Sequence, residues 1–77
     1  MKRISIDLHD MPVIQAKCQI QTVLKNCKKD TDEIEVIHGF HSGDKILKYV
    51  RTDLKHPRIQ GKILGLNNGI TILVLKK

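Results

Sequence analysis

The feature of this sequence that most constrains its fold is a change in hydrophobic period early in the chain. Residues 3–9 alternate strictly between polar and apolar side chains, which is typical of a strand with one buried face. From Val13 to about Cys27 the apolar side chains recur every three or four residues, which predicts an amphipathic helix. Asp10 and Pro12 separate the two patterns, and we expect Asp10 to cap the helix and Pro12 to occupy its first turn.

The same switching of patterns continues along the rest of the chain. It predicts a strand, a second helix capped by Ser42 and ended by His56-Pro57, and two strands joined by a tight turn, at residues 33–38, 46–54, 59–66 and 70–75 with the turn at 67–69. This order favours parallel pairing of the first two strands, and the closing hairpin adds an antiparallel strand. We therefore expect an α/β fold, a two-layer βαβαββ sandwich with a mixed four-stranded sheet, both helices on one face, and a single domain over residues 1–77.

The charge of the chain favours a polyanionic partner. Its 77 residues include 14 Lys or Arg and 8 Asp or Glu, for a net charge of +6, which makes DNA or RNA the first expectation and an acidic membrane surface the second. Phe40 and Tyr49 are the only aromatic residues, too few for a platform on which several bases stack. The longest aliphatic run, residues 70–75, is too short to span a bilayer, so we expect no membrane partner.

Cys18 and Cys27 are expected to remain reduced. They are nine residues apart in one predicted helix. At about 1.5 Å of rise per residue they lie on the order of 13 Å apart, beyond the reach of a disulfide. Neither belongs to a Cys/His pattern typical of zinc sites. Reduced thiols indicate a cytoplasmic protein.

Two histidines stand at the ends of predicted strands, His9 after the first strand and His38 after the second. If those strands pair in parallel, both histidines emerge at the carboxyl edge of the sheet, where open α/β sheets bind ligands. Asp7 precedes His9 by two residues and could orient its imidazole. The loop after the second strand adds small and polar residues next to the second helix: Gly39, His41, Ser42 and Gly43. A glycine-containing backbone at a helix start can approach a phosphate closely.

Each of these residues also has a simpler interpretation. His38 could be a buried histidine bonded to a carbonyl, His41 a solvated loop residue, and Ser42 only a helix cap. The basic flank of the second helix could be no more than a solvated face. Asp7 and the histidines could instead form a metal site, but no helical HxxxH pair or second acidic ligand supports one.

Three segments, taken in order, resemble the motifs of the Smr domain, the small MutS-related domain: residues 6–11 (IDLHDM), 36–39 (VIHG) and 54–59 (LKHPRI). The resemblance covers essentially the whole chain, from about Ile4 to Leu75. It implies a βαβαββ fold similar to the C-terminal domain of the third translation initiation factor. It also implies nucleic-acid binding and, in many members, endonuclease or nicking activity on DNA or RNA.

The resemblance also assigns functional residues. The family's motif residues fall on the following positions of this chain: Asp7, His9, His38, Gly39 and Gly43. The chain departs from the pattern at Asp10, where the first motif closes on a glycine. It departs again at Phe40 and His41, where the second motif has a basic residue and a glycine. These departures favour binding without cleavage as the alternative.

The sequence therefore predicts a nucleic-acid-binding domain with endonuclease activity, in which Asp7, His9 and His38 are catalytic. We expect His9, oriented by Asp7, to act as a general acid or base, and His38 to bind or protonate the scissile phosphate. The residues expected to contact the nucleic acid are Gly39, His41, Ser42, Gly43, Lys45, Lys48, Arg51 and Arg58.

Two questions about the chemistry stay open at this point. RNA could be cut without a metal, whereas cleavage of DNA would favour Mg²⁺ or Mn²⁺ held by Asp7. No small-molecule cofactor is expected. The rival functions are a DNA- or RNA-binding module that does not cut and, with less support, a protein–protein adaptor.

Overall fold

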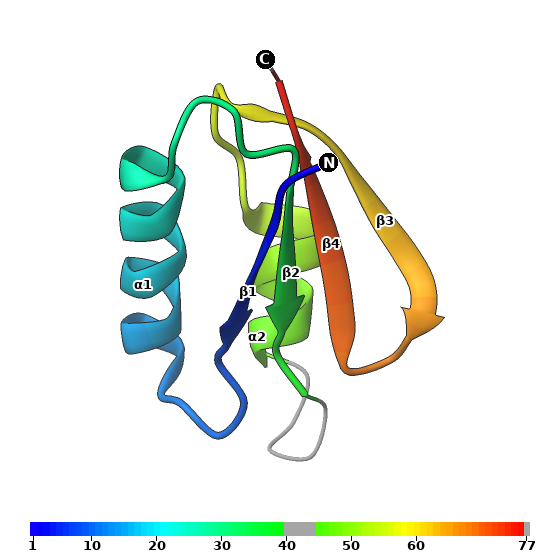
Figure 1. Ribbon diagram of the computed structural model, residues 1–77. Helices are drawn as coiled ribbons and strands as arrows, with labels where there is room; N and C mark the ends of the chain where they lie inside the picture. The colour runs from blue at the N-terminus through cyan, green and yellow to red at the C-terminus, as the bar shows by residue number, and fades with distance from the viewer. Residues whose placement is uncertain (40–44, 77) are drawn as a thin grey trace.

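The computed structural model describes residues 1–39 and 45–76 and contains the predicted order of elements (Figure 1). They are β1 (Arg3–Asp7), α1 (Val13–Asn26), β2 (Glu33–Ile37), α2 (Lys45–Lys48) with its continuation η1 (Tyr49–Asp53), β3 (Ile59–Asn67) and β4 (Ile70–Leu75). The expected α/β class with a mixed four-stranded sheet is confirmed.

The four strands form one sheet in the order β1-β2-β4-β3. β1 and β2 are parallel, as predicted, with Ile4 opposite Ile34 and Asp7 opposite Ile37. β4 lies between β2 and β3 and is antiparallel to both. The last strand of the chain is therefore central, which agrees with its nearly continuous apolar sequence.

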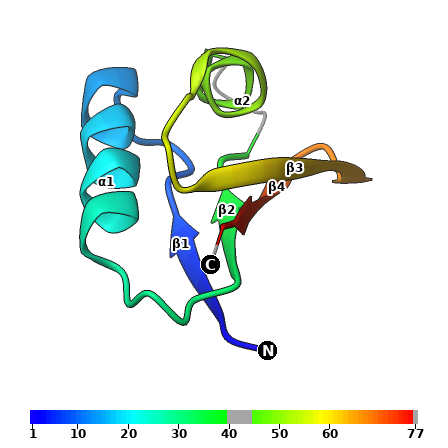
Figure 2. The same cartoon turned by 90° about the horizontal axis from the view of Figure 1, so that it is seen from above.

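Both helices cover the same face of the sheet, as Figure 2 shows. α1 has no glycine or proline in its interior, and Ala16, Ile20 and Leu24 recur at a spacing of four to form its buried stripe. They join one hydrophobic cluster with the core residues of the other elements: Leu8, Ile34, Val36, Ile46, Val50, Leu54, Leu73 and Leu75. Complete burial of a Leu, Ile or Val side chain contributes about 1.5–3 kcal/mol, so this cluster is the main source of stability.

The ends of the first two strands differ from the prediction. β1 ends at Asp7 rather than His9, although the N–H of Leu8 still donates to the carbonyl of Ile37 at 2.7 Å. The chain then turns, because the N–H of Met11 donates back to the carbonyl of Leu8 at 3.2 Å. β2 likewise ends at Ile37, one residue earlier than predicted.

The predicted role of Asp10 as a helix cap is wrong. Asp10 has a φ of 65°, the left-handed conformation that lets the chain reverse after β1. Pro12 occupies the capping position of α1, and no side chain caps the helix there. The predicted cap of the second helix, Ser42, lies outside the described residues.

The second helix has an unusual last turn. After α2, η1 is a π-helix in which the N–H of Leu54 donates to the carbonyl of Tyr49, five residues earlier, at 2.7 Å.

Cys18 is exposed and Cys27 is half-buried, and both are free thiols. Within residues 1–39 and 45–76, no helix is long and apolar enough to cross a membrane.

Candidate active site

The parallel pairing of β1 and β2 brings the segments that follow them to one edge of the sheet. Residues 8–10 and 38–39 leave this edge side by side, at the lower end of Figure 1. The turn between β3 and β4 closes the same edge, because the carbonyl of Gly69 accepts the N–H groups of His38 and Gly39 at 2.9 and 3.0 Å. The convergence expected from the sequence is therefore present for Asp7, His9 and His38.

Asp7 and His9 form an exposed pair at this edge. Nδ1 of His9 is hydrogen-bonded to Oδ1 of Asp7, which also accepts the backbone N–H of His9 at 3.1 Å. On the other side of the ring, Nε2 lies 3.7 Å from Oδ2 of Asp10. The side chains of His9 and Asp7 are 56% and 53% exposed, so a ligand can reach both.

Asp7 and His9 each favour the charged form of the other. The hydrogen bond to Asp7, and then the negative charges of Asp7 and Asp10, raise the pKa of His9 above its ordinary value. The same hydrogen bond, with the backbone N–H of His9, lowers the pKa of Asp7. The arrangement therefore favours an imidazolium held by a carboxylate up to a higher pH than in a free histidine, with its proton at the solvent edge.

Gly39 packs directly on His9. Its φ of +69° lies in the left-handed region, and a Cβ at this position would stand 3.1 Å from Cβ of His9. A residue with a side chain would strain the backbone and press on His9. The N–H of Gly39 is already donated to Gly69. The glycine therefore serves close packing here, and its N–H is not open to a phosphate.

His38 occupies the opposite kind of environment. It is 3% exposed, and its ring nitrogens bond to the carbonyl of Gly39 at 2.9 Å and to Oγ1 of Thr71 at 2.8 Å. Burial lowers the pKa of His38, and the positive charge of Arg51 lowers it further. The ring is therefore neutral and enclosed, which corresponds to the simpler interpretation of this residue, a buried histidine bonded to a carbonyl.

Arg51 determines which atoms donate and which accept in the hydrogen bonds that join Thr71, His38 and Gly39. Its Nε donates to Oγ1 of Thr71 at 2.9 Å. The hydroxyl hydrogen of Thr71 can then be donated to Nε2 of His38, which leaves Nδ1–H of His38 to donate to Gly39. The sequence missed Thr71, although a polar residue in a strand that reads ITILVL was a usable signal.

The basic residues predicted to contact nucleic acid do not lie together. Lys45 and Lys48 are exposed on α2, but Arg51 is partly buried and also donates to the carbonyls of Asn67 and Ile70 at 3.0 and 3.1 Å. Arg58 comes just before β3, which begins at the far end of the molecule (Figure 1). There it donates to three carbonyls at the end of α1, those of Leu24, Cys27 and Lys28, at 2.9, 2.9 and 3.0 Å. The predicted contacts His41, Ser42 and Gly43 lie outside the described residues.

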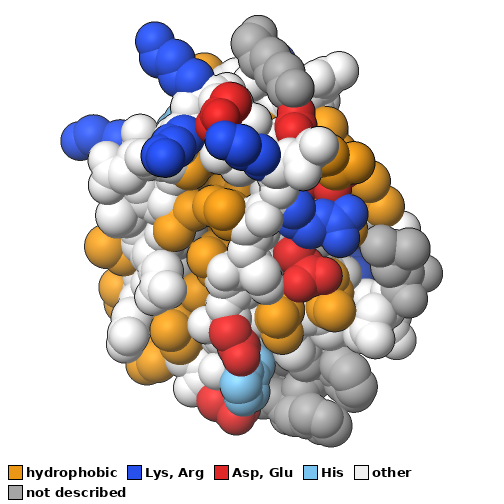
Figure 3. Space-filling view, viewed as in Figure 1, with side chains coloured by type: hydrophobic (Ala, Val, Ile, Leu, Met, Phe, Trp, Pro, Cys, Tyr) orange, Lys and Arg blue, Asp and Glu red, His pale blue; other side chains and the backbone are white. Residues whose placement is uncertain are grey.

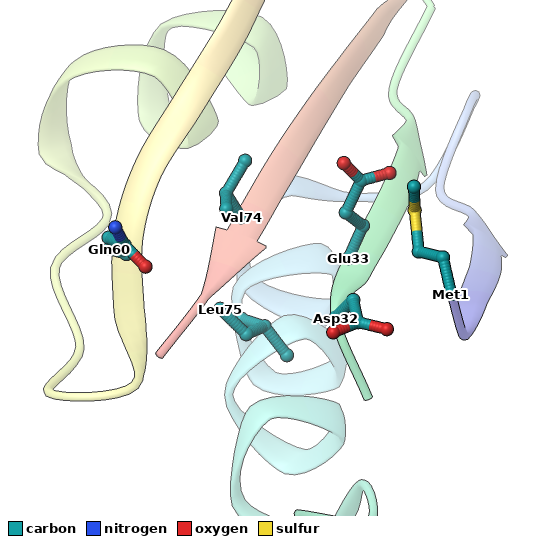
Figure 4. Close-up of a pocket in the computed structure, with 6 residues that line it drawn as sticks. All are labelled: Met1, Asp32, Glu33, Gln60, Val74 and Leu75. Carbon is teal, nitrogen blue, oxygen red and sulfur yellow. The ribbon is translucent and has the colours of Figure 1, made fainter. Parts of the chain in front are cut away.

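A hollow at the other end of the sheet offers no comparable site. It is lined by Met1, Asp32, Glu33, Gln60, Val74 and Leu75, so its charged side chains are acidic (Figure 4). Figure 3 shows the open face of the sheet between the two ends, with a histidine beside acidic side chains at its lower end and Lys and Arg toward its upper end. In the part of the chain that the structure describes, no three His, Cys, Asp or Glu side chains are grouped to hold a metal ion.

Of three comparisons with known proteins, the one with solved structures identifies the fold. No protein-family model matches this chain, and no curated protein matches it. Among solved structures, it is similar to the crystal structure of the Smr domain of Thermus thermophilus MutS2, with a TM-score of 0.84 and 17% sequence identity over 100% of both chains. The chain therefore has the fold of an Smr domain, as its three motifs predict.

Proposed function

We propose that this chain is a nucleic-acid-binding domain that cleaves a phosphodiester backbone with the Asp7–His9 pair. The observation that carries the proposal is an exposed imidazole whose pKa is raised by a carboxylate bonded to it, at the carboxyl edge of two parallel strands. The likeness in fold to a MutS2 Smr domain and the net charge of +6 support a polyanionic substrate.

The raised pKa favours His9 as a general acid rather than a general base. In RNA, the 2′-oxygen would attack the phosphorus and lose its proton to solvent, and the bond to the 5′-oxygen would break as His9 protonates that oxygen. The products would be a 2′,3′-cyclic phosphate and a 5′-hydroxyl. Asp7 would hold the imidazole in place and stabilise its charged form.

Cleavage of DNA would require water as the nucleophile, and a divalent ion then becomes part of the proposal. Asp7 is the carboxylate that would hold Mg²⁺ or Mn²⁺ there, together with the substrate phosphates, since Mg²⁺ commonly binds one or two carboxylates along with phosphate oxygens. The ion would stabilise charge that develops on the phosphate.

The buried His38 supports a positioning role rather than direct contact with the phosphate. Both of its ring nitrogens have protein partners, and through its bond to Gly39 it holds the backbone that packs on His9. We therefore assign the acid to His9, its orientation to Asp7, and the support of the edge to His38.

A cleavage assay tests this proposal. Labelled single- and double-stranded DNA and RNA would be incubated with wild type, His9→Ala and Asp7→Asn, each with and without EDTA. His56→Ala is the matched control, because His56 accepts the backbone N–H of Arg58 in the segment before β3, and β3 begins at the other end of the molecule (Figure 1). We expect His9→Ala to lose about 10²–10⁴-fold in rate and the control to keep its rate. Equal cleavage by wild type and His9→Ala would refute the assignment.

A binding module that does not cut is the second candidate, and one observation favours it. Of the histidines that the structure describes at this edge, His9 alone has an exposed ring, so no second imidazole there could serve as a general base for the 2′-hydroxyl. This candidate predicts affinity that falls steeply with added salt while no product forms on any of the four substrates.

A further inference from the structure

The positive charge of the chain is concentrated in its helical layer. Residues 13–29 and 45–55 contain eight Lys or Arg and one acidic residue, Asp53, for a net charge of +7. Because the whole chain carries +6, everything outside these two segments sums to −1. The helix-bearing segments therefore carry the whole excess of positive charge, and the remainder of the chain carries none.

Tyr49 joins the outer surfaces of the two helices. Nζ of Lys17 lies 5.0 Å from the centre of the Tyr49 ring, and Nε2 of Gln21 donates to the Tyr49 hydroxyl at 3.2 Å. Lys45 and Lys48 belong to the helical turn immediately before Tyr49, and both are exposed, as is Lys17. We call this group of side chains, Lys17, Gln21, Lys45, Lys48 and Tyr49, the α1–α2 surface.

The α1–α2 surface adjoins the edge that carries Asp7 and His9. Both helices begin at that edge, and Lys45 is the first residue of α2 (Figure 1). At the far end of α1, Lys28 and Lys29 are followed by Asp30 and, after Thr31, by Asp32. Those carboxylates place negative charge near Lys28, although both also bond to Lys2. α1 contributes no acidic residue to the α1–α2 surface, and the acidic residue next to that surface in sequence is Asp44, before Lys45.

From these observations we infer that the α1–α2 surface is the docking surface for a nucleic-acid backbone, with Lys17, Lys45 and Lys48 as phosphate contacts. The inference rests on the proposed function and adds to it the face along which the substrate lies. The other polyanion, an anionic membrane, fits less well. Helices that lie on bilayers bury an exposed apolar face, but the apolar stripe of α1 is already buried in the core, and Ile14, which is 84% exposed, is a single apolar side chain rather than a face.

Salt dependence of binding tests the inference. Each phosphate contact contributes about 0.7 to the slope of log affinity against log salt for single strands and about 0.9 for duplex DNA. The triple variant Lys17→Ala/Lys45→Ala/Lys48→Ala should therefore flatten the slope by roughly two to three units and weaken binding on the order of 10- to 100-fold at 0.1 M salt. Fluorescence anisotropy with labelled single-stranded RNA and duplex DNA measures both quantities.

Two matched variants accompany the test. Lys28→Ala/Lys29→Ala/Lys76→Ala removes the same charge from exposed lysines of the opposite end and should leave most of the slope in place. Lys17→Arg/Lys45→Arg/Lys48→Arg keeps the charge and should bind as wild type does. Circular dichroism of each variant confirms that the fold is kept.

The outcomes separate this inference from the proposed function. The inference about the docking surface is overturned if the control triple variant loses as much affinity as the test variant, or if neither variant changes the salt slope. It is also overturned if phosphatidylglycerol-containing vesicles, but not nucleic acid, bind through these three lysines. Cleavage by wild type and His9→Ala, measured on the same samples, reports on the Asp7–His9 chemistry alone. Binding through the three lysines without any cleavage would support the docking surface and refute the proposed nuclease activity.

Discussion

The two histidines that follow the parallel strands differ in what surrounds each ring. His9 is exposed and bonded to the Asp7 carboxylate, which raises its pKa. Burial, and then the charge of Arg51, lowers the pKa of His38. Neighbouring positions at one sheet edge thus hold one imidazole that favours the protonated form and one that stays neutral. Of these two, the exposed ring alone can give a proton to a ligand.

The Asp7–His9 pair predicts a particular pH dependence for cleavage. If His9 is the general acid, activity falls as pH rises through its pKa, which lies above the ordinary histidine value of about 6.5. Asp7→Asn removes the carboxylate that raises this pKa, so the alkaline fall should move to lower pH. Rates measured across the pH range for both proteins test this, and an unchanged alkaline limb would show that Asp7 does not tune the acid.

Gly39 offers a second test at the residue scale, with a glycine of the same chain as its control. Gly39→Ala should cost about 1–2 kcal/mol of unfolding free energy, because the left-handed φ disfavours a Cβ. The Cβ would also press on His9, so cleavage or binding at the edge should weaken. Gly61→Ala should stay within about 0.5 kcal/mol of wild type, since no atom lies within 4 Å of its added Cβ. Equal urea unfolding curves for the two variants would contradict this account.

Among the elements, η1 and the β3–β4 hairpin are tied together behind the edge that carries Asp7 and His9. Arg51 on η1 donates to Thr71 and to the carbonyls at both ends of the hairpin turn. Thr71 bonds to His38, and His38 bonds to Gly39. A helix and two strands therefore hold the segment on which His9 rests, and none of the linking side chains needs to touch substrate.

This chain of bonds predicts that Arg51 matters for stability more than its neighbours do. Arg51→Gln should cost about 1–3 kcal/mol, because Thr71 and two carbonyls lose a charged donor. Lys45→Gln, an exposed change of the same charge, should stay within about 0.5 kcal/mol. Urea unfolding compares them, and an NMR titration should find the pKa of His38 raised in Arg51→Gln. If both variants unfold alike, Arg51 is only a surface cation.

What the sequence could predict at this scale depended on local patterns. Period-two and period-three-to-four spacing located all six predicted elements, and the strand–helix–strand order gave the parallel pair that brings His9 and His38 together. The positions of Arg51 and Arg58 had no local signal. A basic residue on a helical flank or after a proline has the same sequence pattern whether its side chain faces solvent or bonds to carbonyls. Arg58 does the latter: it donates to the carbonyl of Leu24, 34 residues earlier in the sequence.

Across the whole molecule, the proposed catalytic pair and the contacts of Arg58 that stabilise the end of α1 lie at opposite ends. The edge with Asp7 and His9 adjoins the start of both helices, whereas Arg58 closes the end of α1 on the far side. The sequence predicts Arg58 as a nucleic-acid contact, because it shares the positive charge of the other candidates. In the fold its guanidinium is occupied by the carbonyls of Leu24, in the last turn of α1, and of Cys27 and Lys28 just after it. The last carbonyls of a helix have no partner within the helix.

Arg58 therefore provides a test that separates charge from position. Arg58→Gln should lower the unfolding free energy by about 1–3 kcal/mol, since the carbonyls of Leu24, Cys27 and Lys28 lose a charged donor. Its affinity for nucleic acid and the salt dependence of binding should match those of Lys28→Gln, which removes one charge at the same end without this loss of stability. Urea unfolding and anisotropy titrations, both at a temperature where the variants are folded, measure the two effects. A variant that stays as stable as wild type but loses about 0.7–0.9 of the salt slope would make Arg58 a phosphate contact. The nucleic acid would then have to reach the far end of the molecule as well as the α1–α2 surface.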